Sequence, residues 1–372
     1  ASLNANQLRS MTTAQLSVMG SSQINSFGLA YVSALNTQQI ASISSNTIAG
    51  LQSTTLRSLV TDQYKALTTA QLFNLSTTQI QAIEVDDITA FSSLQLNAMR
   101  TDQTAALTTR QIQALSTRQI IDLSSNWIQS LTTAQVVALT QDQVKSLRTQ
   151  QINVLQSNQI QAIETRDLIG LTNHQISSLS TIQLSRLTTS QVAALTTGQI
   201  TAVQTQHIAA MSTAQVRAMT ASQMAKLGTS QVAALSTGQL QALTSLQIGS
   251  LSTRSIAALT TDQFIWLGST QIAGLNSDQM RAIVSSDLIV MNTDQLRSLS
   301  ASQIAALNQK QVSVMTSDQL QSLTTTQVQA INSQSISGIN SGQLANMTID
   351  QIAALTTAQI NQIKPIAWTG LG

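Results

Sequence analysis

The residues of this chain that could do metal or acid–base chemistry are few and regularly spaced. His207 and Asp167 stand 40 residues apart, and Asp87 and Asp287 lie on the same 40-residue series. A histidine beside a carboxylate could bind a metal ion or form an acid–base pair. Residues on neighbouring turns of a coil would lie about 10 Å apart, too far to share one ion. We therefore predict no catalytic, metal-binding or cofactor-binding residues and no enzymatic activity.

The composition excludes most other site chemistry as well. Of 372 residues, 9% are charged, 2% are aromatic, two are histidine and none is cysteine, so disulfides and thiolate metal sites are excluded. A formal net charge of +2 gives no basic patch for nucleic acid. The longest apolar runs are only a few residues, whereas a membrane span needs about 20. We expect no nucleic-acid partner and no membrane span.

An eight-residue repeat organises the chain from Asn4 to Ile363. This segment divides into 45 octads without an insertion, with the consensus Thr/Ser/Asn-Thr-x-Gln-Ile/Leu/Val-x-Ala-Leu. Position 8 is apolar in all 45 octads, and position 5 is apolar or Tyr in 44, with Thr104 as the exception. Position 4 is Gln in 35 octads. Positions 5 and 8 are therefore the predicted core.

Each octad also carries a complete helix-start signal. A Ser or Thr followed three residues later by Gln is a capping box, as in Thr132 with Gln135 and Thr188 with Gln191. The apolar residues that flank each box are placed for a hydrophobic staple. The representative core residues around these two caps are Leu131, Val136, Leu139, Val192 and Leu195. The pattern predicts an all-α chain of very short helices, one per octad.

Two other arrangements are possible for an eight-residue repeat. In one continuous helix the apolar stripe would drift by about 80° per octad, so it could not form a coiled-coil seam. A β-solenoid is the stronger alternative, because short Thr-rich repeats can form stacked strands. However, positions 5 and 8 would point to opposite faces of a strand, and the chain has only 14 glycines for corners. The helical interpretation is preferred and the β-solenoid is kept as the alternative.

A second, longer period appears in the residues that replace Gln at position 4. They include Thr47, Asp87, Trp127, Asp167, His207 and Asp287. Most of these variant positions recur every 40 residues, and an Asp series at position 3 has the same spacing, with members Asp62, Asp102, Asp142 and Asp262. We interpret 40 residues as one turn of a superhelix. The predicted fold is a superhelical α-solenoid with about five helices per turn and nine turns.

The chain is predicted to contain one solenoid domain at residues 4–363. It is flanked by an N-terminal extension at residues 1–3 and by a C-terminal tail at residues 364–372, outside the repeat. The tail is apolar and holds the only proline, so Pro365, Trp368 and Leu371 are the candidate self-assembly residues. The tail could dock on its own chain, pair with another subunit or lead to a further domain. The absence of an initiator Met and a signal peptide suggests a chain processed or cut from a larger one.

Two surface features have both a functional and a structural interpretation. Trp127 and Trp266 could be platforms on which a ligand stacks, but we expect them to be packing variants of the repeat. Position 2 is often Thr, as at Thr109, Thr133 and Thr189, which would give exposed rows of hydroxyl groups. Such rows could bind ice or glycan. The preferred interpretation is a weakly charged, soluble surface.

Two resemblances follow from these repeats. The segment LTTAQVVALT at residues 131–140 resembles the opening helix of TAL effector repeats, but the 34-residue unit and its base-reading loop are absent, so DNA binding is not implied. Over about 360 residues, the TTxQ(I/V)xAL pattern resembles tracts of large bacterial surface or secreted adhesin-like proteins, some of them labelled haem-utilisation proteins. This resemblance implies an extracellular or bacterial cell-surface location and a structural role. Two histidines and no cysteine give no support for haem.

The functional expectation is a non-enzymatic extracellular structural protein. Its solenoid rod would act as a filament subunit or an adhesin stalk and could assemble head to tail, so the expected partner is another copy or the rest of a longer chain. The alternative is a binding module whose outer Thr/Ser/Gln face recognises ice, glycan or a protein partner.

Overall fold

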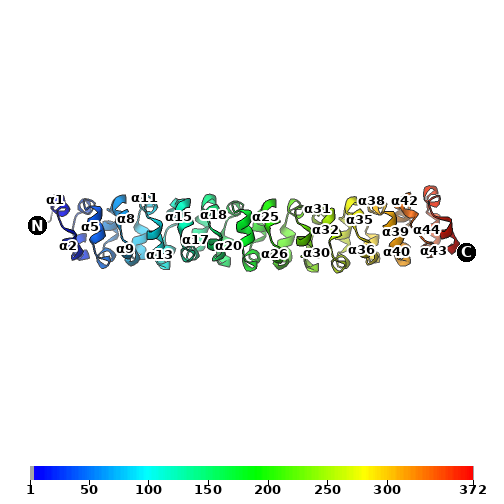
Figure 1. The fold of residues 1–372 in the computed structure, drawn as a ribbon, viewed down its shortest axis with the longest axis horizontal. Coiled ribbons are helices and arrows are strands. Elements are labelled where there is room, and N and C mark those ends of the chain that lie inside the picture. Colours follow the sequence, from blue (N-terminus) through cyan, green and yellow to red (C-terminus); the bar gives the residue numbers. More distant parts are fainter. Residues whose placement is uncertain (1–3, 372) are drawn as a thin grey trace. The chain divides into compact units, whose positions relative to one another are not determined.

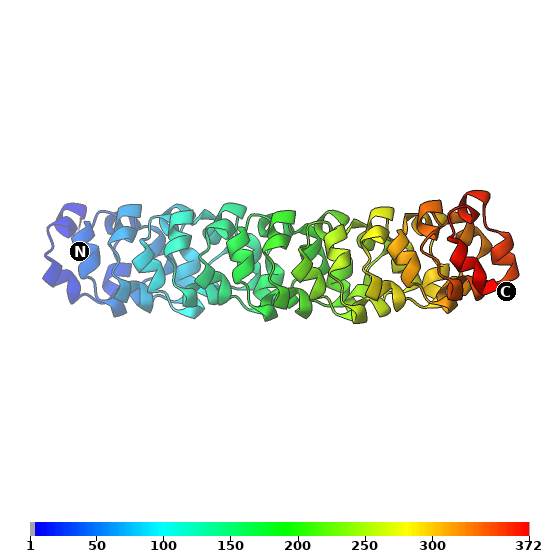
Figure 2. The same cartoon turned by 45° about the vertical axis from the view of Figure 1, so that its right-hand side comes forward.

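The computed structural model describes residues 4–371, apart from the side chains of residues 30, 370 and 371. The predicted extension at residues 1–3 lies outside this part of the chain. The chain divides into two compact units, residues 1–186 (unit 1) and residues 187–372 (unit 2). Each unit is a succession of short helices (Figures 1 and 2).

The helices of unit 1 are α1 (Ala5–Arg9), α2 (Thr13–Ser17), α3 (Ser21–Asn25), α4 (Leu29–Val32), α5 (Thr37–Ser42), α6 (Ser45–Ala49), α7 (Ser53–Arg57), α8 (Thr61–Ala66), α9 (Thr69–Asn74), α10 (Thr77–Ala82), α11 (Val85–Thr89), α12 (Ser93–Asn97), α13 (Thr101–Ala106), α14 (Thr109–Ala114), α15 (Thr117–Asp122), α16 (Ser125–Gln129), α17 (Thr133–Ala138), α18 (Gln141–Ser146), α19 (Thr149–Asn153), α20 (Ser157–Ala162), α21 (Thr165–Leu168), α22 (Asn173–Ser178) and α23 (Thr181–Ser185).

The helices of unit 2 are α24 (Thr189–Ala194), α25 (Thr197–Ala202), α26 (Thr205–Ala210), α27 (Thr213–Ala218), α28 (Ala221–Met224), α29 (Thr229–Ala233), α30 (Thr237–Ala242), α31 (Ser245–Ser250), α32 (Thr253–Ala257), α33 (Thr261–Ile265), α34 (Ser269–Ala273), α35 (Ser277–Ala282), α36 (Ser285–Ile289), α37 (Thr293–Arg297), α38 (Ala301–Ala306), α39 (Gln309–Val314), α40 (Ser317–Ser322), α41 (Thr325–Ala330), α42 (Ser333–Ile336), α43 (Ser341–Ala345), α44 (Ile349–Ala353), α45 (Thr357–Ile360) and the 3-10 helix η1 (Pro365–Leu371).

The predicted fold class is confirmed. Residues 4–371 contain no strand, and helices α1–α45 follow one another at one per octad, each beginning at position 2. The β-solenoid alternative is therefore excluded for this part of the chain. No helix among the described residues is long and apolar enough to cross a membrane.

The capping box starts each helix in the predicted way. The Thr132 hydroxyl accepts a hydrogen bond from the Gln135 backbone N–H at 3.2 Å, and the Thr132 N–H donates to Gln135 Oε1 at 2.7 Å. Thr188 and Gln191 make the same pair of bonds at 3.1 and 2.8 Å. These bonds satisfy two N–H groups that would otherwise lack partners in a helix this short.

Extended residues at positions 8 and 1 turn the chain after helices such as α17. Leu139 has φ −60° and ψ 137°, and Thr140 has φ −78° and ψ 160°. No described residue has a positive φ. The corners therefore need no glycine, which explains how a chain with so few glycines can turn at every octad.

Positions 5 and 8 form the core of each unit. Leu131, Val136 and Leu139 in unit 1, and Val192 and Leu195 in unit 2, are all less than 5% exposed. Most of the Gln side chains at position 4 are buried beside them. The core is therefore a layer of aliphatic side chains with an amide at its edge in almost every octad.

The number of helices per turn differs from the prediction. Within each unit a helix packs mainly on the helices three before and three after it, as α14 does on α17 and α35 on α38. The position-4 Gln of a helix bonds to the helix four before it, as Gln143 on α18 does to Ile112 on α14. A turn therefore contains between three and four helices. The prediction of five helices per turn, and with it nine turns, is wrong because it took the 40-residue period for the length of a turn.

Candidate functional site

The polar feature common to both units is the buried Gln at position 4, and we call these side chains together the glutamine ladder. Gln143 Oε1 accepts from the Thr140 N–H at 2.9 Å, and its Nε2 donates to the carbonyl oxygens of Ile112 and Leu115 at 2.9 and 2.7 Å. In unit 2, Gln279 Nε2 donates to Ile248 and Leu251 in the same way. Each amide thus caps its own helix and joins it to the helix four octads earlier. These side chains are fully engaged within the fold and do not titrate.

At the variant position Asp87, a second residue takes over the role of the missing glutamine. Asp87 is buried on α11 and accepts from the Thr61 hydroxyl of α8 at 2.8 Å. A glutamine at position 87 would donate to the Leu56 carbonyl, and the Tyr64 hydroxyl of α8 donates to that carbonyl instead, at 2.7 Å. Burial, and next the nearby carboxylate of Asp87, raises the pKa of Tyr64. Tyr64 and Asp87 together replace one rung of the ladder.

The other two aspartates of the series, Asp167 and Asp287, are also buried within the fold. Asp287 on α36 accepts from the Thr261 hydroxyl of α33 at 2.9 Å, while its Oδ2 has no partner among the described residues. Burial raises the pKa of Asp287, and the hydrogen bonds from Thr261 and Ser286 oppose this rise. Burial likewise raises the pKa of Asp167, which lies 3.7 Å from the Arg166 guanidinium.

Trp127 is matched to an exceptional residue three octads earlier. Its side chain is 3% exposed, so the predicted packing role is correct, and its indole N–H has no partner in the described part of the chain. Thr104 on α13 lines the same cavity of about 250 Å³ as Trp127 on α16. Thr104 is the one position-5 residue that is neither apolar nor Tyr. A small residue at position 5 thus accompanies a large one at position 4.

Pairs such as Tyr64 with Asp87 and Thr104 with Trp127 explain why two series of unusual residues share the 40-residue period. Each position-3 aspartate of the second series lies three octads before one of the variant positions Asp87, Trp127, Asp167 and Asp287. Helices three octads apart pack together, as α8 does with α11 and α33 with α36. The period therefore marks recurring packing partners. The unusual residues Tyr64 and Thr104 were the signal in the sequence that could have shown this.

His207 and the acidic residues do not assemble into a metal centre. Burial lowers the pKa of His207, and its Nδ1 has no partner among the described residues. The structure describes no group of three or more His, Asp or Glu side chains placed to hold a metal ion. Ion pairs such as Lys65 with Asp62, at 3.1 Å, lie on the surface.

The prediction for the second tryptophan, Trp266, is wrong. We predicted a packing variant, but the Trp266 side chain on the C-terminal end of α33 is 57% exposed. It occupies position 7 of its octad, where the consensus residue is a small alanine at the edge of the core. A large side chain at that position extends into solvent.

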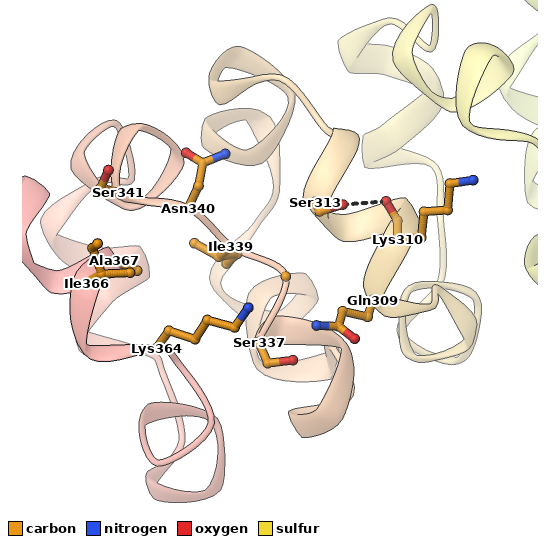
Figure 3. Close-up of a pocket in the computed structure, with 11 residues that line it drawn as sticks. Gln309, Lys310, Ser313, Ser337, Ile339, Asn340, Ser341, Lys364, Ile366 and Ala367 are labelled. Carbon is orange, nitrogen blue, oxygen red and sulfur yellow. Dashed lines mark hydrogen bonds between the residues drawn. The ribbon is translucent and has the colours of Figure 1, made fainter.

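The C-terminal segment docks on its own chain. Helix η1 packs on α43, which is the relation of helices three octads apart elsewhere in the coil. In the octad frame Pro365 takes position 2 and Trp368 takes position 5, and Trp368 is half-buried. The side chain of Leu371 lies outside the described residues. A pocket of about 550 Å³ lies beside η1, lined by residues of α39, the segment between α42 and α43, the start of α43 and the tail (Figure 3).

A family model, the ALTTAQ repeat, matches six segments of the chain. They are residues 80–117, 160–197, 200–237, 232–269, 280–317 and 288–325. Together these segments cover 192 of the 372 residues, just over half. The chain belongs to the ALTTAQ repeat family. A search among curated proteins gave no match.

The family name describes the junction between two octads. The hexapeptide ALTTAQ occurs at residues 66–71 and 354–359. It runs from position 7 of one octad to position 4 of the next, so it holds a core leucine, the capping Thr and the ladder Gln. The ALTTAQ matches therefore support the repeat tract that the sequence predicts.

Proposed function

We propose that this chain is a non-enzymatic structural segment of a bacterial extracellular or cell-surface protein, acting as an adhesin stalk or as a filament subunit. The glutamine ladder is the observation that supports it. Each rung joins a helix to the helix four octads earlier, as Gln151 Nε2 does to the Ile120 and Leu123 carbonyl oxygens at 2.8 and 2.7 Å. Adjacent turns are thus held by hydrogen bonds as well as by the core, which suits a part that must resist deformation.

The proposed location rests on the sequence. The chain has few charges and no cysteine, so it has no thiol that an oxidising, exposed environment could change. The octad pattern resembles tracts of large bacterial surface or secreted proteins, and the chain belongs to a family defined by such repeats. These features together favour the bacterial cell surface over an intracellular role.

Association with further copies is part of the proposal. The segment that holds the candidate residues Pro365 and Trp368 also carries Ile366, whose side chain is 75% exposed. An apolar side chain this exposed next to a docked helix could contact a second copy of the chain. Such contacts would allow head-to-tail growth.

Electron microscopy of the purified chain over a range of concentrations tests this proposal, with circular dichroism of the same samples. We expect helical dichroism and particles that lengthen with concentration. Ile366→Asp should reduce the lengthening, whereas Ile349→Asp, at an 88% exposed isoleucine on α44, should leave it unchanged. Particles of one length at every concentration would refute self-assembly and leave the stalk as the proposed role.

A binding module is the second candidate, and exposed apolar side chains favour it. Leu94 and Leu246 at position 3 are 72% and 70% exposed, and Trp266 is exposed beside the 42% exposed Ile265. Aromatic and aliphatic groups among hydroxyls and amides suit a glycan or a protein better than ice. A glycan array probed with the parent chain and with Trp266→Ala would separate this role from the purely structural one.

A further inference from the structure

The pocket beside η1 is built by the docking of the tail. Ala367 on η1 is 1% exposed where this helix packs on α43. On the opposite wall, a Cβ atom at Gly338 would lie 2.4 Å from the Gln309 carbonyl oxygen, so the end of α42 must approach α39 closely. The cavity of about 550 Å³ is therefore framed by three packed elements of unit 2.

The charged groups of this pocket all have one sign. Lys310 and Lys364 line it, and none of the lining residues is acidic. Among residues 4–371 neither lysine forms an ion pair. Figure 3 shows the Lys364 side chain extending from the start of the tail toward the end of α42, near Ser337. The Lys364 ammonium group beside this half-enclosed cavity favours an anionic ligand, whereas Figure 3 shows the Lys310 side chain extending away from the tail.

The remaining walls combine polar and apolar groups. Asn340 Oδ1 accepts from the Gln343 N–H at 2.9 Å, while its amide nitrogen makes no hydrogen bond with the described residues. Ser341 follows it in the lining. Ile366 supplies the exposed aliphatic surface, whereas Ile339 behind it is only 3% exposed. A ligand that used all of these groups would carry a negative charge, hydroxyl groups and an apolar face.

We propose that this pocket binds an acidic sugar, one or two rings that bear a carboxylate. The carboxylate would lie against the Lys364 ammonium and hydroxyl groups against Asn340 and Ser341. The C–H face of the ring would contact Ile366. A bare inorganic anion would leave the aliphatic surface and most of the volume unused. This site is distinct from the Thr/Ser/Gln outer face. It shares Ile366 with the contact proposed between copies, but its test at Lys364 does not depend on that contact.

Isothermal titration of the full chain with glucuronate and a glucuronate-containing disaccharide tests the proposal. Glucose and inorganic sulfate serve as comparison ligands. We expect binding of the acidic sugars, no binding of glucose, and weaker binding as salt is raised. Lys364→Gln should weaken binding by about tenfold, the loss of one charge-assisted contact. The matched variant Lys226→Gln, at an exposed lysine of unit 2 outside the pocket, should bind like the parent.

Three results would overturn the proposal. The first is no heat of binding for either acidic sugar with a chain whose dichroism is native. The second is an unchanged affinity in Lys364→Gln. The third is sulfate binding as tight as that of the disaccharide, because the pocket would then recognise charge alone.

Discussion

At the scale of the residue, the side-chain amide of a ladder glutamine accepts a hydrogen bond through its oxygen and donates through its nitrogen. An ionised carboxylate cannot do both. Gln143 is 2% exposed, with its oxygen on the Thr140 N–H and its nitrogen on the Ile112 and Leu115 carbonyls. Gln143→Glu keeps the shape but turns an oxygen toward two carbonyl oxygens in a buried place. We expect a loss of about 2–4 kcal/mol in the free energy of unfolding, measured by urea denaturation.

Gln113→Glu is the matched control for this substitution. Gln113 lies at position 6 on α14, one turn from Gln143, and its side chain is exposed. The same chemical change there should alter the stability by less than about 0.5 kcal/mol. Equal effects at the two positions would show that the ladder bonds do not stabilise the coil.

A second prediction at the residue scale concerns Asp287. Burial raises its pKa, so the folded chain holds this proton more tightly than the unfolded chain does. Lowering the pH from neutral toward about pH 4 therefore stabilises the native state at this site. Asp287→Asn keeps an acceptor for Thr261 and cannot ionise. It should be more stable than the parent at neutral pH by roughly 1 kcal/mol, and the difference should shrink near pH 4 in thermal unfolding.

Asp278→Asn controls for a general effect of charge. Asp278 is exposed on α35 and pairs with Arg281 at 2.8 Å. Because exposed ion pairs contribute little, this variant should unfold close to the parent at both pH values. A gain for Asp287→Asn that does not change with pH would contradict the assignment of the effect to its carboxyl group.

At the scale of the element, the pair formed by α8 and α11 explains why two unusual residues occur together. The Tyr64 hydroxyl donates to the Leu56 carbonyl because Asp87 cannot. Tyr64→Leu alone should leave that carbonyl without a donor, and Asp87→Gln alone should place two donors on one acceptor. The double variant restores the consensus rung, so we expect it to be at least as stable as the parent. A double-mutant cycle by urea denaturation should give a coupling of about 1–2 kcal/mol.

Strict additivity would contradict this pairing. The residues Val144 on α18 and Asp167 on α21 are the matched comparison, because they have the same spacing as Tyr64 and Asp87 but Val144 has no hydroxyl group to donate. Val144→Leu should therefore show no comparable coupling with Asp167→Gln.

The elements themselves could be predicted from the sequence, but their arrangement in a turn could not. The bonds of Thr132 with Gln135 join residues three apart, so the octad pattern contained them in full. The Nε2 bonds of the same glutamine reach Thr104 and Leu107, 31 and 28 residues earlier. Which carbonyls lie there depends on the corner angle set by residues such as Leu139 and Thr140, and no local pattern gives that angle. The pocket at η1 was missed for the same reason, since its walls come from α39, α43 and the tail.

At the scale of the whole molecule, each unit is a one-dimensional array in which an octad meets mainly the octads three and four away. Adding one octad should therefore change the stability little wherever it does not separate two residues that are matched across helices, as Thr104 and Trp127 are. Inserting the consensus octad TTAQVVAL after Leu227 meets this condition. The bond that it separates, from the Ser255 hydroxyl to the Leu227 carbonyl, can form equally with the leucine that ends the inserted octad. We expect the free energy of unfolding of this variant to stay within about 1 kcal/mol of the parent in urea denaturation.

The same octad inserted after Leu115 should be harmful. It moves Trp127 from above Thr104 to above Ile112, a larger side chain that is fully buried. Forcing an indole against it should cost about 1–3 kcal/mol. Adding Trp127→Gln to this insertion should recover the loss, because a glutamine at position 4 fits above an isoleucine throughout the coil. If both insertions are tolerated equally, the 40-residue period is not a record of packing partners three octads apart. If Trp127→Gln does not restore the stability of the chain with the insertion after Leu115, the loss of stability comes from the inserted octad itself.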